Sequence, residues 1–208
     1  TFDGDGDRCL VADRHSIYDG DFILAAAASY LQSRGTLNKN KVVATTMSNL
    51  GLELFLKRRE IELLRVPVGD RYVLGKLESE NLSLGGEQSG HIIFMNDTFI
   101  GDGLITALQL LRISKAQGVS LAELCKDFEK CPQILLNIPV QRKPELTSIE
   151  EVRDGIDRIQ QELNGSGRIV VRYSGTEMLA RIMIEGKDQQ YIEKAAKTLG
   201  EIIRRNLS

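Results

Sequence analysis

The strongest constraint on the fold of this chain is a regular alternation between short β-branched runs and longer helical runs. The segment KVVATTM at 41–47 is typical of a buried strand, and the alanine-rich run 21–34, followed by Gly35, predicts a helix with a glycine stop. Further strands are expected at 9–13, 62–69, 82–86 and 91–94, and further helices at 50–60, 70–79, 101–118 and 120–128. Strands that alternate with helices predict a three-layer α/β domain with a mixed or mostly parallel sheet.

The pattern changes near residue 130, in a stretch that holds three of the four prolines of the chain. We therefore expect an α/β domain at 15–130 and a smaller α+β domain of β-α-β-β-α order at 131–208. In the second domain, Ser148 and Glu151 have the spacing of a capping box at a helix start. The elements expected there are a strand at 133–140, a helix at 148–164, two strands flanking YSGTE and a final helix at about 188–206.

Charge and cysteine content exclude several classes of function. A net charge of −2 over 208 residues gives no electrostatic basis for binding nucleic acid or an anionic membrane. No apolar run approaches the ~20 residues of a membrane span. The three cysteines are odd in number and have no CxxC spacing, which favours a reduced cytoplasmic protein over a disulfide scaffold or a zinc site. The oligomeric state is not determined by the sequence, and a homodimer is one option.

Three aspartates alternate with glycine in the segment FDGDGDR at 2–8. In an extended segment Asp3, Asp5 and Asp7 point the same way, and the glycines leave room for their carboxylates to converge. Convergent carboxylates suit a hard divalent cation such as Mg²⁺. The alternative is a solvated Asp-Gly turn. A calcium-binding EF-hand loop fails on spacing, because its glycine and glutamate positions are occupied by Arg8 and Arg14.

A second polar loop, GGEQSGH at 85–91, combines three glycines with hydrogen-bonding side chains. Glu87, Gln88 and Ser89 could hold the hydroxyl groups of a sugar, whereas a simple surface hairpin turn is the alternative. Histidine is the side chain that ordinarily changes charge near neutral pH, so His91 is either a proton shuttle or a structural histidine.

The third candidate site is the hairpin RIVVRYSGTEMLARIMIEG. If SGTE forms a four-residue loop, Arg172 pairs with Leu179, and Arg172 and Arg181 lie on one face while the apolar residues lie on the other. Two guanidinium groups beside Ser174, Thr176 and the loop N–H groups would form a phosphate cradle. The alternative is that surface strands carry arginine for solubility.

The order of these motifs, FDGDGDR, VGDRYV, GGEQSGH and RYSGTE…R, resembles the second half of the α-D-phosphohexomutase superfamily over essentially all of the chain. GEQSGH together with VGDRYV and RYSGTE is most similar to the branch that acts on an amino-sugar phosphate. The branch that acts on mannose and glucose phosphates is the alternative within the superfamily, and a noncatalytic sugar-phosphate-binding module is the alternative outside it.

The resemblance implies that the three loops serve one active site. The aspartate loop, on the end of a second domain contributing 1–14, would hold Mg²⁺ with its three aspartates. Arg8 and His91 would take catalytic roles, Arg8 by helping to hold a phosphoserine. The implied substrate contacts are Gly69, Asp70, Arg71, Glu87, Gln88 and Ser89 in a third domain and Arg172, Ser174, Gly175, Thr176 and Arg181 in a fourth.

The implied reaction interconverts glucosamine 6-phosphate and glucosamine 1-phosphate through a phosphoserine enzyme and a 1,6-bisphosphate intermediate. Superfamily members carry that serine in a first domain, and no such motif occurs here. We therefore expect this chain to be a C-terminal fragment of a longer protein, which would explain the missing initiator methionine, and to be inactive without the N-terminal domains.

Overall fold

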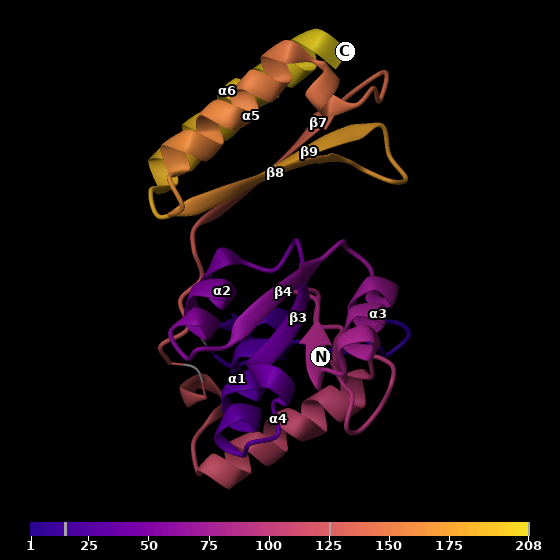
Figure 1. The fold of residues 1–208 in the computed structure, drawn as a ribbon, viewed down its shortest axis with the longest axis vertical. Coiled ribbons are helices and arrows are strands. Elements are labelled where there is room, and N and C mark those ends of the chain that lie inside the picture. Colours follow the sequence, from indigo (N-terminus) through magenta and orange to yellow (C-terminus); the bar gives the residue numbers. More distant parts are fainter. Residues whose placement is uncertain (15, 125, 208) are drawn as a thin grey trace. The chain divides into compact units, whose positions relative to one another are not determined.

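A computed structural model of the chain describes residues 1–14, 16–124 and 126–207. His15, Cys125 and Ser208 lie outside the described residues. The chain divides into two compact units, Thr1–Lys130 and Cys131–Ser208, here called unit 1 and unit 2 (Figure 1). None of the described helices is both long and apolar enough to cross a membrane.

Unit 1 contains a four-stranded sheet in the order β4-β3-β5-β6. β3 (Lys41–Thr45) lies parallel to both β4 (Glu62–Val66) and β5 (Leu84–Gly86). β6 (Ile92–Phe94) runs antiparallel to β5 at one edge. The carboxyl ends of the three parallel strands therefore meet at the same edge of the sheet, which is where open α/β sheets bind ligands.

Helices cover both faces of this sheet and make the three layers that the sequence predicts. α1, α2 and α4 pack on the face that carries Val42 and Ala44, whereas α3 packs on the face that carries Val43. Successive residues of β3 enter opposite cores because side chains of a strand alternate between its two faces. The helices are α1 (Gly20–Ser33), α2 (Leu50–Lys57), α3 (Asp70–Glu80) and α4 (Gly103–Gln117). Short 3₁₀ helices lie at Asn38–Asn40 and Leu121–Glu123. The helix expected at 120–128 is thus reduced, among the described residues, to the second of these, since 124 and 126–128 are not helical.

Different residues precede the first turns of α2 and α3. Asn49 caps α2, since its side-chain oxygen accepts a hydrogen bond from the Gly51 N–H at 2.8 Å. In α3, Asp70 is the first helical residue, and Gly69 precedes it with a φ of 131°. That conformation favours glycine, so the turn before α3 depends on Gly69 itself.

α4 carries apolar side chains on two faces. Leu104, Leu108 and Leu111 have helical spacing in the sequence, yet their exposed fractions are 61%, 56% and 57%. The face that packs on the sheet layer instead contains Leu110 and Ile113, each 1% exposed. Spacing alone does not distinguish the two faces, because both repeat with the helical period.

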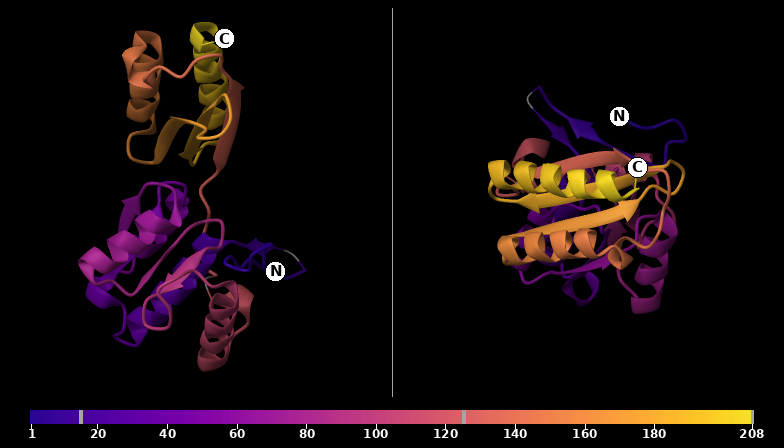
Figure 2. Two further views of the ribbon diagram at one scale, coloured as in Figure 1. Left: turned by 90° about the vertical axis from the view of Figure 1, so that its right-hand side faces the viewer. Right: turned by 90° about the horizontal axis from the view of Figure 1, so that it is seen from above.

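The expected strand at 9–13 is shorter than predicted and is not part of the main sheet. β1 (Val11–Ala12) pairs antiparallel with β2 (Ile17–Tyr18) in a separate hairpin, which stands apart from the four-stranded sheet (Figure 2). Cys9 is buried and forms an isolated bridge with Phe2. This bridge closes the N-terminal segment into a loop that contains all three aspartates.

Unit 2 is a three-stranded antiparallel sheet in the order β7-β9-β8, covered on one face by α5 and α6. The capping box predicted from Ser148 is wrong, because Ser148 belongs to a short 3₁₀ helix and its hydroxyl donates to the carbonyl oxygen of Glu145. The elements are β7 (Gln133–Pro139), a 3₁₀ helix (Leu146–Ser148), α5 (Glu150–Leu163), β8 (Gly167–Tyr173), β9 (Leu179–Gly186) and α6 (Gln189–Leu207).

Candidate functional site

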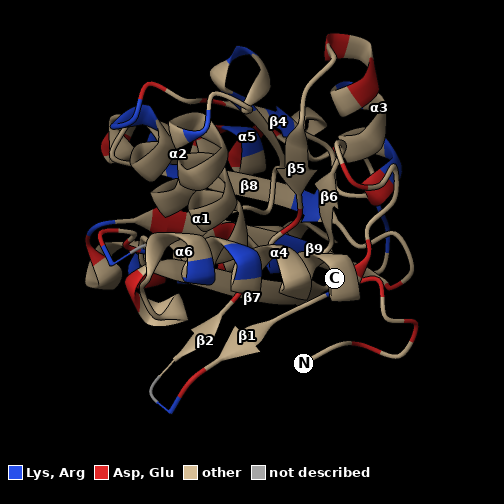
Figure 3. Ribbon diagram, turned by 90° about the horizontal axis from the view of Figure 1, so that it is seen from below, with Lys and Arg blue, Asp and Glu red and all other residues tan. Residues whose placement is uncertain are grey.

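The three aspartates of the N-terminal loop converge. Asp3, Asp5 and Asp7 each offer a carboxylate oxygen, and these atoms all lie within 4.8 Å of one another. Figure 3 shows acidic residues gathered on this N-terminal segment. Gly6 has a φ of 77°, which turns the chain between the last two aspartates. The three carboxylate groups therefore lie close enough to bind one cation, an approach that a solvated Asp-Gly turn does not require.

Backbone hydrogen bonds attach the aspartate loop to the rest of unit 1. The Gly103 N–H, at the start of α4, donates to the Gly6 carbonyl oxygen at 2.9 Å. The Cys9 N–H donates to the Gly90 carbonyl oxygen at 3.0 Å. A side chain at Gly90 would collide with the backbone, because its Cβ would lie 2.3 Å from the Cys9 oxygen. The loop is therefore held against both α4 and the loop that ends at His91.

The charges in this loop suit a divalent cation. Burial, followed by the nearby charges of Asp3 and Asp5, raises the pKa of Asp7. Burial also acts on Asp3, but the backbone N–H and guanidinium group of Arg8 outweigh it and lower the pKa of Asp3. Arg8 Nε lies 2.7 Å from Asp3 Oδ2 and 3.6 Å from Asp7 Oδ1. Asp7 Oδ1 is buried and accepts no hydrogen bond from the described residues, so the Arg8 guanidinium group is its nearest cationic neighbour. Carboxylate oxygens so placed fit the preference of Mg²⁺.

His91 lies at the aspartate loop. Its side chain is 8% exposed, and its Nε2 is 3.5 Å from Asp7 Oδ2. Gly101 packs against the ring so closely that a Cβ there would lie 2.1 Å from Nε2. A hollow of about 340 Å³ is lined by Asp7 and His91 together with Asp70, Arg71, Leu74, Ile93, Phe99, Ile100 and Gly101. The structure thus brings His91, Asp70 and Arg71 together with the aspartate loop.

The segment 87–91 is the hairpin turn between β5 and β6, so the hairpin alternative describes its backbone correctly. The Gly90 N–H donates to the Glu87 carbonyl oxygen at 3.0 Å. The side chain of Glu87 accepts a hydrogen bond from the Gly69 N–H at 3.1 Å, which joins this turn to the segment before α3. The same turn also lines a polar hollow. This second hollow, of about 530 Å³, is lined by Asp19, Thr45, Met47, Val68, Glu87, Gln88 and Ser89.

Four of the residues in this second hollow are missing from the sequence-based prediction. Thr45 ends β3, and Met47 and Val68 follow β3 and β4 closely. Asp19 caps α1 and accepts a hydrogen bond from the Phe22 N–H at 3.5 Å. The signal that could have found Thr45, Met47 and Val68 is their place at or just after the ends of parallel strands, at the edge of the sheet where ligands bind. Asp19 instead lies between β2 and α1, so this signal does not identify it.

The β8–β9 hairpin of unit 2 has a different register from the one predicted. Tyr173 pairs with Ala180 rather than with Met178, and Arg172 pairs with Arg181 rather than with Leu179. The shift is two residues, so every side chain keeps its predicted face. Ile169, Val171, Tyr173, Ala180, Ile182 and Ile184 belong to the core beneath α5 and α6. The two arginines consequently oppose each other directly on the other face of the sheet.

Local hydrogen bonds shape the loop that joins β8 to β9. The Ser174 N–H donates to the Leu179 carbonyl oxygen at 2.8 Å, which closes a loop longer than the four residues expected. Ser174 is buried, whereas Gly175 and Thr176 are exposed. Glu177 Oε2 lies 2.6 Å from a terminal nitrogen of Arg181, and the Arg181 Nε is buried without a hydrogen-bond acceptor among the described residues.

Lys143 is a further basic residue at this loop that the sequence analysis misses. Its ammonium group donates to the Ser174 carbonyl oxygen at 2.6 Å. Lys143 precedes a proline in an irregular segment far from the hairpin in sequence, so nothing local identifies it. A hollow of about 460 Å³ between α5 and α6 contains none of the predicted site residues, and the chemistry of the hairpin points to a different part of unit 2.

Curated proteins named phosphoglucosamine mutase are similar to nearly the whole chain. The one from Clostridium botulinum (strain 657 / Type Ba4) is 46% identical over 206 residues, which is 98% of this chain and 46% of that protein. The one from Thermoanaerobacter sp. (strain X514) is 47% identical over 211 residues, which is 100% of this chain and 47% of that protein. The chain thus spans about half the length of these relatives.

Solved structures share the fold. A crystal structure of N-acetylphosphoglucosamine mutase from Aspergillus fumigatus in complex with GlcNAc-6P and magnesium has a TM-score of 0.83 at 21% identity, covering 100% of this chain and 48% of that one. A phosphoglucomutase/phosphomannomutase family protein from Burkholderia thailandensis has a TM-score of 0.72 at 22% identity, covering 95% of this chain and 46% of that one.

Two sequence models of one family match consecutive parts of the chain. The phosphoglucomutase/phosphomannomutase α/β/α domain III model matches residues 19–131, and the C-terminal domain model of the same family matches residues 135–201. These matches confirm the resemblance to the α-D-phosphohexomutase superfamily. Because the domain III match alone covers more than half of the 208 residues, this chain belongs to the phosphoglucomutase/phosphomannomutase family.

Proposed function

We propose that this chain is the sugar- and phosphate-binding half of a phosphoglucosamine mutase. The whole enzyme would interconvert glucosamine 6-phosphate and glucosamine 1-phosphate, transferring phosphate from a phosphoserine and back through a 1,6-bisphosphate. Its product would feed cell-wall precursor synthesis in a bacterial cytoplasm. The observation that carries the proposal is the direct pairing of Arg172 with Arg181 beside a loop of hydroxyl groups, because that arrangement suits a phosphate dianion.

In unit 1, Asp3, Asp5 and Asp7 would hold Mg²⁺, which supplies Lewis-acid stabilisation of the charge on a transferring phosphoryl group. Arg8 lies against two of these carboxylates and would pair with an oxygen of the phosphoserine. His91 Nε2 lies 3.5 Å from Asp7 Oδ2 and would hold a proton for the attacking or leaving hydroxyl group.

The sugar itself would occupy the hollow lined by Glu87, Gln88 and Ser89, with the Gly69–Arg71 segment nearby. A carboxylate that accepts from sugar hydroxyl groups fixes the ring orientation. In unit 2, Arg172, Arg181, Ser174, Gly175 and Thr176 would bind the phosphate that does not react. Binding energy from that distant phosphate would hold the reacting oxygen in line, which phosphoryl transfer requires more than covalent help from the protein.

The phosphoserine of the superfamily has no counterpart in this sequence. We therefore propose that the 208 residues alone do not turn over substrate and that the activity needs the N-terminal domains that the relatives' greater length indicates. Mutase turnover by the isolated chain would contradict this part of the proposal.

An NMR titration tests the proposed function. The chain is titrated with glucosamine 6-phosphate, glucose 6-phosphate and inorganic phosphate, and the Arg172→Ala/Arg181→Ala variant is the control. The proposal expects amide shifts at 172–181 with all three ligands, loss of these shifts in the variant, and further shifts at 85–91 with the amino sugar.

Two other results would change the assignment. Equal shifts at 85–91 with both sugar phosphates would favour an enzyme of the same family acting on glucose or mannose phosphates. Shifts at neither loop, even at high millimolar ligand, would overturn the proposed binding roles.

A further inference from the structure

Asp21 is a buried carboxylate in the first turn of α1. Its exposed fraction is 0%, although isolated buried carboxylates are unfavourable unless hydrogen bonds or charges compensate them. Its Oδ2 accepts a hydrogen bond from the Asn49 backbone N–H at 2.8 Å, across 28 positions of sequence. The carboxylate of Asp21 therefore ties α1 to the segment Thr45–Asn49, which connects β3 to α2.

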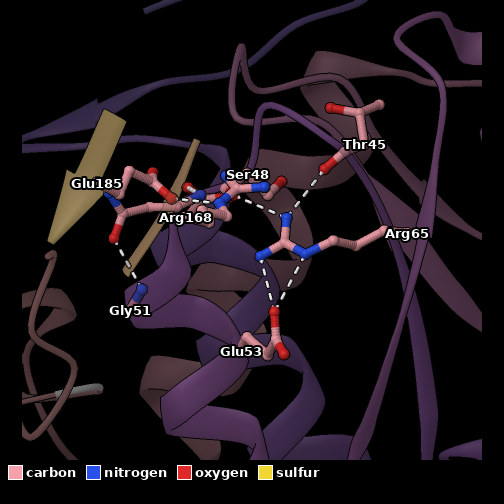
Figure 4. A network of polar contacts seen from close by, with 9 residues as sticks. Thr45, Ser48, Gly51, Glu53, Arg65, Arg168 and Glu185 are labelled. Carbon is pink, nitrogen blue, oxygen red and sulfur yellow. Dashed lines mark hydrogen bonds and ion pairs between the residues drawn. The ribbon is translucent and has the colours of Figure 1, made fainter. Parts of the chain in front are cut away.

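Thr45–Asn49 is one wall of the hollow that we assign to the sugar, since Thr45 and Met47 line it. From the side of β4, Arg65 donates to the carbonyl oxygens of Thr45 at 3.4 Å and Ser48 at 2.9 Å and pairs with Glu53 at 3.1 Å (Figure 4). Arg65 thus fixes the carbonyl groups of this wall, and Asp21 fixes an N–H group at its end. The wall is held from two elements that lie outside it.

The opposite wall is held by the neighbours of Asp21. The Gly20 N–H donates to the Gln88 carbonyl oxygen at 3.0 Å, and Asp19 lines the hollow directly. Three consecutive residues at the start of α1 therefore contact the hollow in different ways: Asp21 bonds to one wall, Gly20 bonds to the other, and Asp19 lines the space between them. Asp21 itself is buried and is not among the residues that line the hollow.

We propose that Asp21 is a positioning residue for sugar binding, whose carboxylate sets the spacing between the Thr45–Asn49 wall and the turn at Glu87–Ser89. The inference rests on the proposed function for the identity of the ligand, an amino-sugar phosphate. The positioning itself rests only on the hydrogen bond to Asn49 and on the shared helix turn.

The charged groups nearest Asp21 also bear on its state. Burial raises the pKa of Asp21 to about 7, and the charge of Asp19 adds to this effect, while the Asn49 N–H, the Ser48 side chain and Lys130 oppose it. Lys130 Nζ lies 2.5 Å from Asp19 Oδ2, so these two charges largely compensate each other beside α1. The strength of the hydrogen bond to Asn49 should then change near neutral pH, because ionised acceptors form the stronger bonds.

The amide resonance of Asn49 reports this contact directly. We expect the Asn49 amide proton to move downfield between pH 5 and pH 9 with a midpoint near neutrality, following ionisation of Asp21. In the Asp21→Asn variant this titration should vanish, and in the Asp21→Ala variant the amides of Thr45–Asn49 should shift as a group. Asp97→Asn, an exposed acid of the same unit that bonds to Gln109, is the control and should leave the Asn49 titration in place.

A ligand titration connects this contact to binding. At pH 8 we expect Asp21→Ala to weaken the affinity for glucosamine 6-phosphate by about tenfold, and Asp21→Asn, which keeps an acceptor oxygen, to weaken it less. Affinity for inorganic phosphate, which would bind to unit 2, should be unchanged. Amide resonances of unit 1 distant from Asp21, such as those of α3, should stay in place in the variant, which excludes unfolding of unit 1 as the cause.

Each result has a separate meaning. If the Asn49 amide does not titrate and the Asp21→Ala variant leaves the resonances of 45–49 in place, the positioning role is overturned. If the wall moves but the sugar affinity does not, Asp21 is structural only and the inference also fails. If the unsubstituted chain binds no sugar phosphate at all, the proposed function fails, whereas the amide titration still decides whether Asp21 holds the wall.

Discussion

The backbone N–H of Gly20 and the carbonyl oxygen of Gln88 are joined by a hydrogen bond of 3.0 Å. This contact brings the first turn of α1 against the turn between β5 and β6. No side chain fits between them, because a Cβ on Gly20 would lie 1.9 Å from the Glu87 carbonyl oxygen. Only a glycine at position 20 allows the two backbones to approach this closely, and this approach fixes the position of Gln88 at the hollow.

The first prediction concerns this approach. Gly20→Ala should reduce the free energy of unfolding of unit 1 by about 2–3 kcal/mol, as overpacking of rigid backbone does. Gly75→Ala is the matched control, since Gly75 is also helical and its Cβ would meet nothing within 4 Å. It should stabilise α3 by about 0.5–1 kcal/mol. Urea unfolding followed through amide signals of unit 1 measures both changes, and equal effects would contradict the packing argument.

A second prediction concerns the pH dependence of stability. Asp21 has a pKa of about 7 in the folded chain and an ordinary value of 3.8 when exposed. The folded state therefore binds more protons than the unfolded state between these values, and the free energy of unfolding falls as pH rises through this window. Asp21→Asn removes this contribution, so its stability relative to the unsubstituted chain should increase from pH 4 to pH 8. An unchanged difference over that range would mean that Asp21 ionises like an exposed acid.

The aspartate loop gives a third prediction. Asp7→Asn should weaken Mg²⁺ or Mn²⁺ binding by about tenfold or more, because it removes one charge and one ligand oxygen from the converging set. Asp13→Asn changes the same charge in the neighbouring β1–β2 hairpin, where Asp13 bonds to Ser16 and Tyr18. Calorimetry or Mn²⁺-induced line broadening should show weaker binding only for the first variant. Equal weakening by both would indicate a diffuse charge effect.

Lys143 gives a fourth prediction. If its ammonium group both fixes the Ser174 carbonyl and adds positive charge to the phosphate loop, Lys143→Ala should weaken phosphate binding by about tenfold. Lys194→Ala, on α6 of the same unit, should have little effect. A titration with inorganic phosphate, monitored at the amides of 172–181, compares the two. No difference between them would remove Lys143 from the site.

α4 allows a fifth prediction, a comparison of two leucines six residues apart. Leu110→Ala should lower the free energy of unfolding by about 2–5 kcal/mol, because it opens a cavity in the core. Leu104→Ala should change it by no more than about 0.5 kcal/mol, because Leu104 is exposed. Thermal unfolding of both variants would decide the matter. A large loss for Leu104 would show that its face is covered in solution.

Local patterns were sufficient to predict the layers and most elements of the fold. The β-branched run of β3 predicts only a strand, and the alanine-rich run of α1 predicts only a helix, because the length and composition of each run agree. The convergence of Asp3, Asp5 and Asp7 was expected for an extended segment, but the structure reaches it through a bend at 4–6 in which Gly6 has a φ of 77°. The faces of Arg172 and Arg181 were predictable for the same reason, even though their register was not.

What the sequence did not reveal depends on contacts distant in the chain. The register of the β8–β9 hairpin depends on how many residues the loop needs, and a slip of two leaves the side-chain pattern unchanged. The role of Asp21 requires the position of Asn49, and that of Lys143 requires the position of Ser174. No periodicity encodes such pairs, so polar residues that act across elements were missed while regular apolar ones were found.

The opposed arginines of the β8–β9 hairpin, Arg172 and Arg181, affect the stability of unit 2. Like charges directly across a strand pair repel each other and weaken it, and Glu177 pairs with only one of the two. A dianion that joins Arg172 and Arg181 would remove this repulsion from the folded state alone. Because phosphate would bind only the folded state, the free energy of unfolding of unit 2 should rise with phosphate concentration. The β8–β9 hairpin would then open less often as its ligand becomes more abundant.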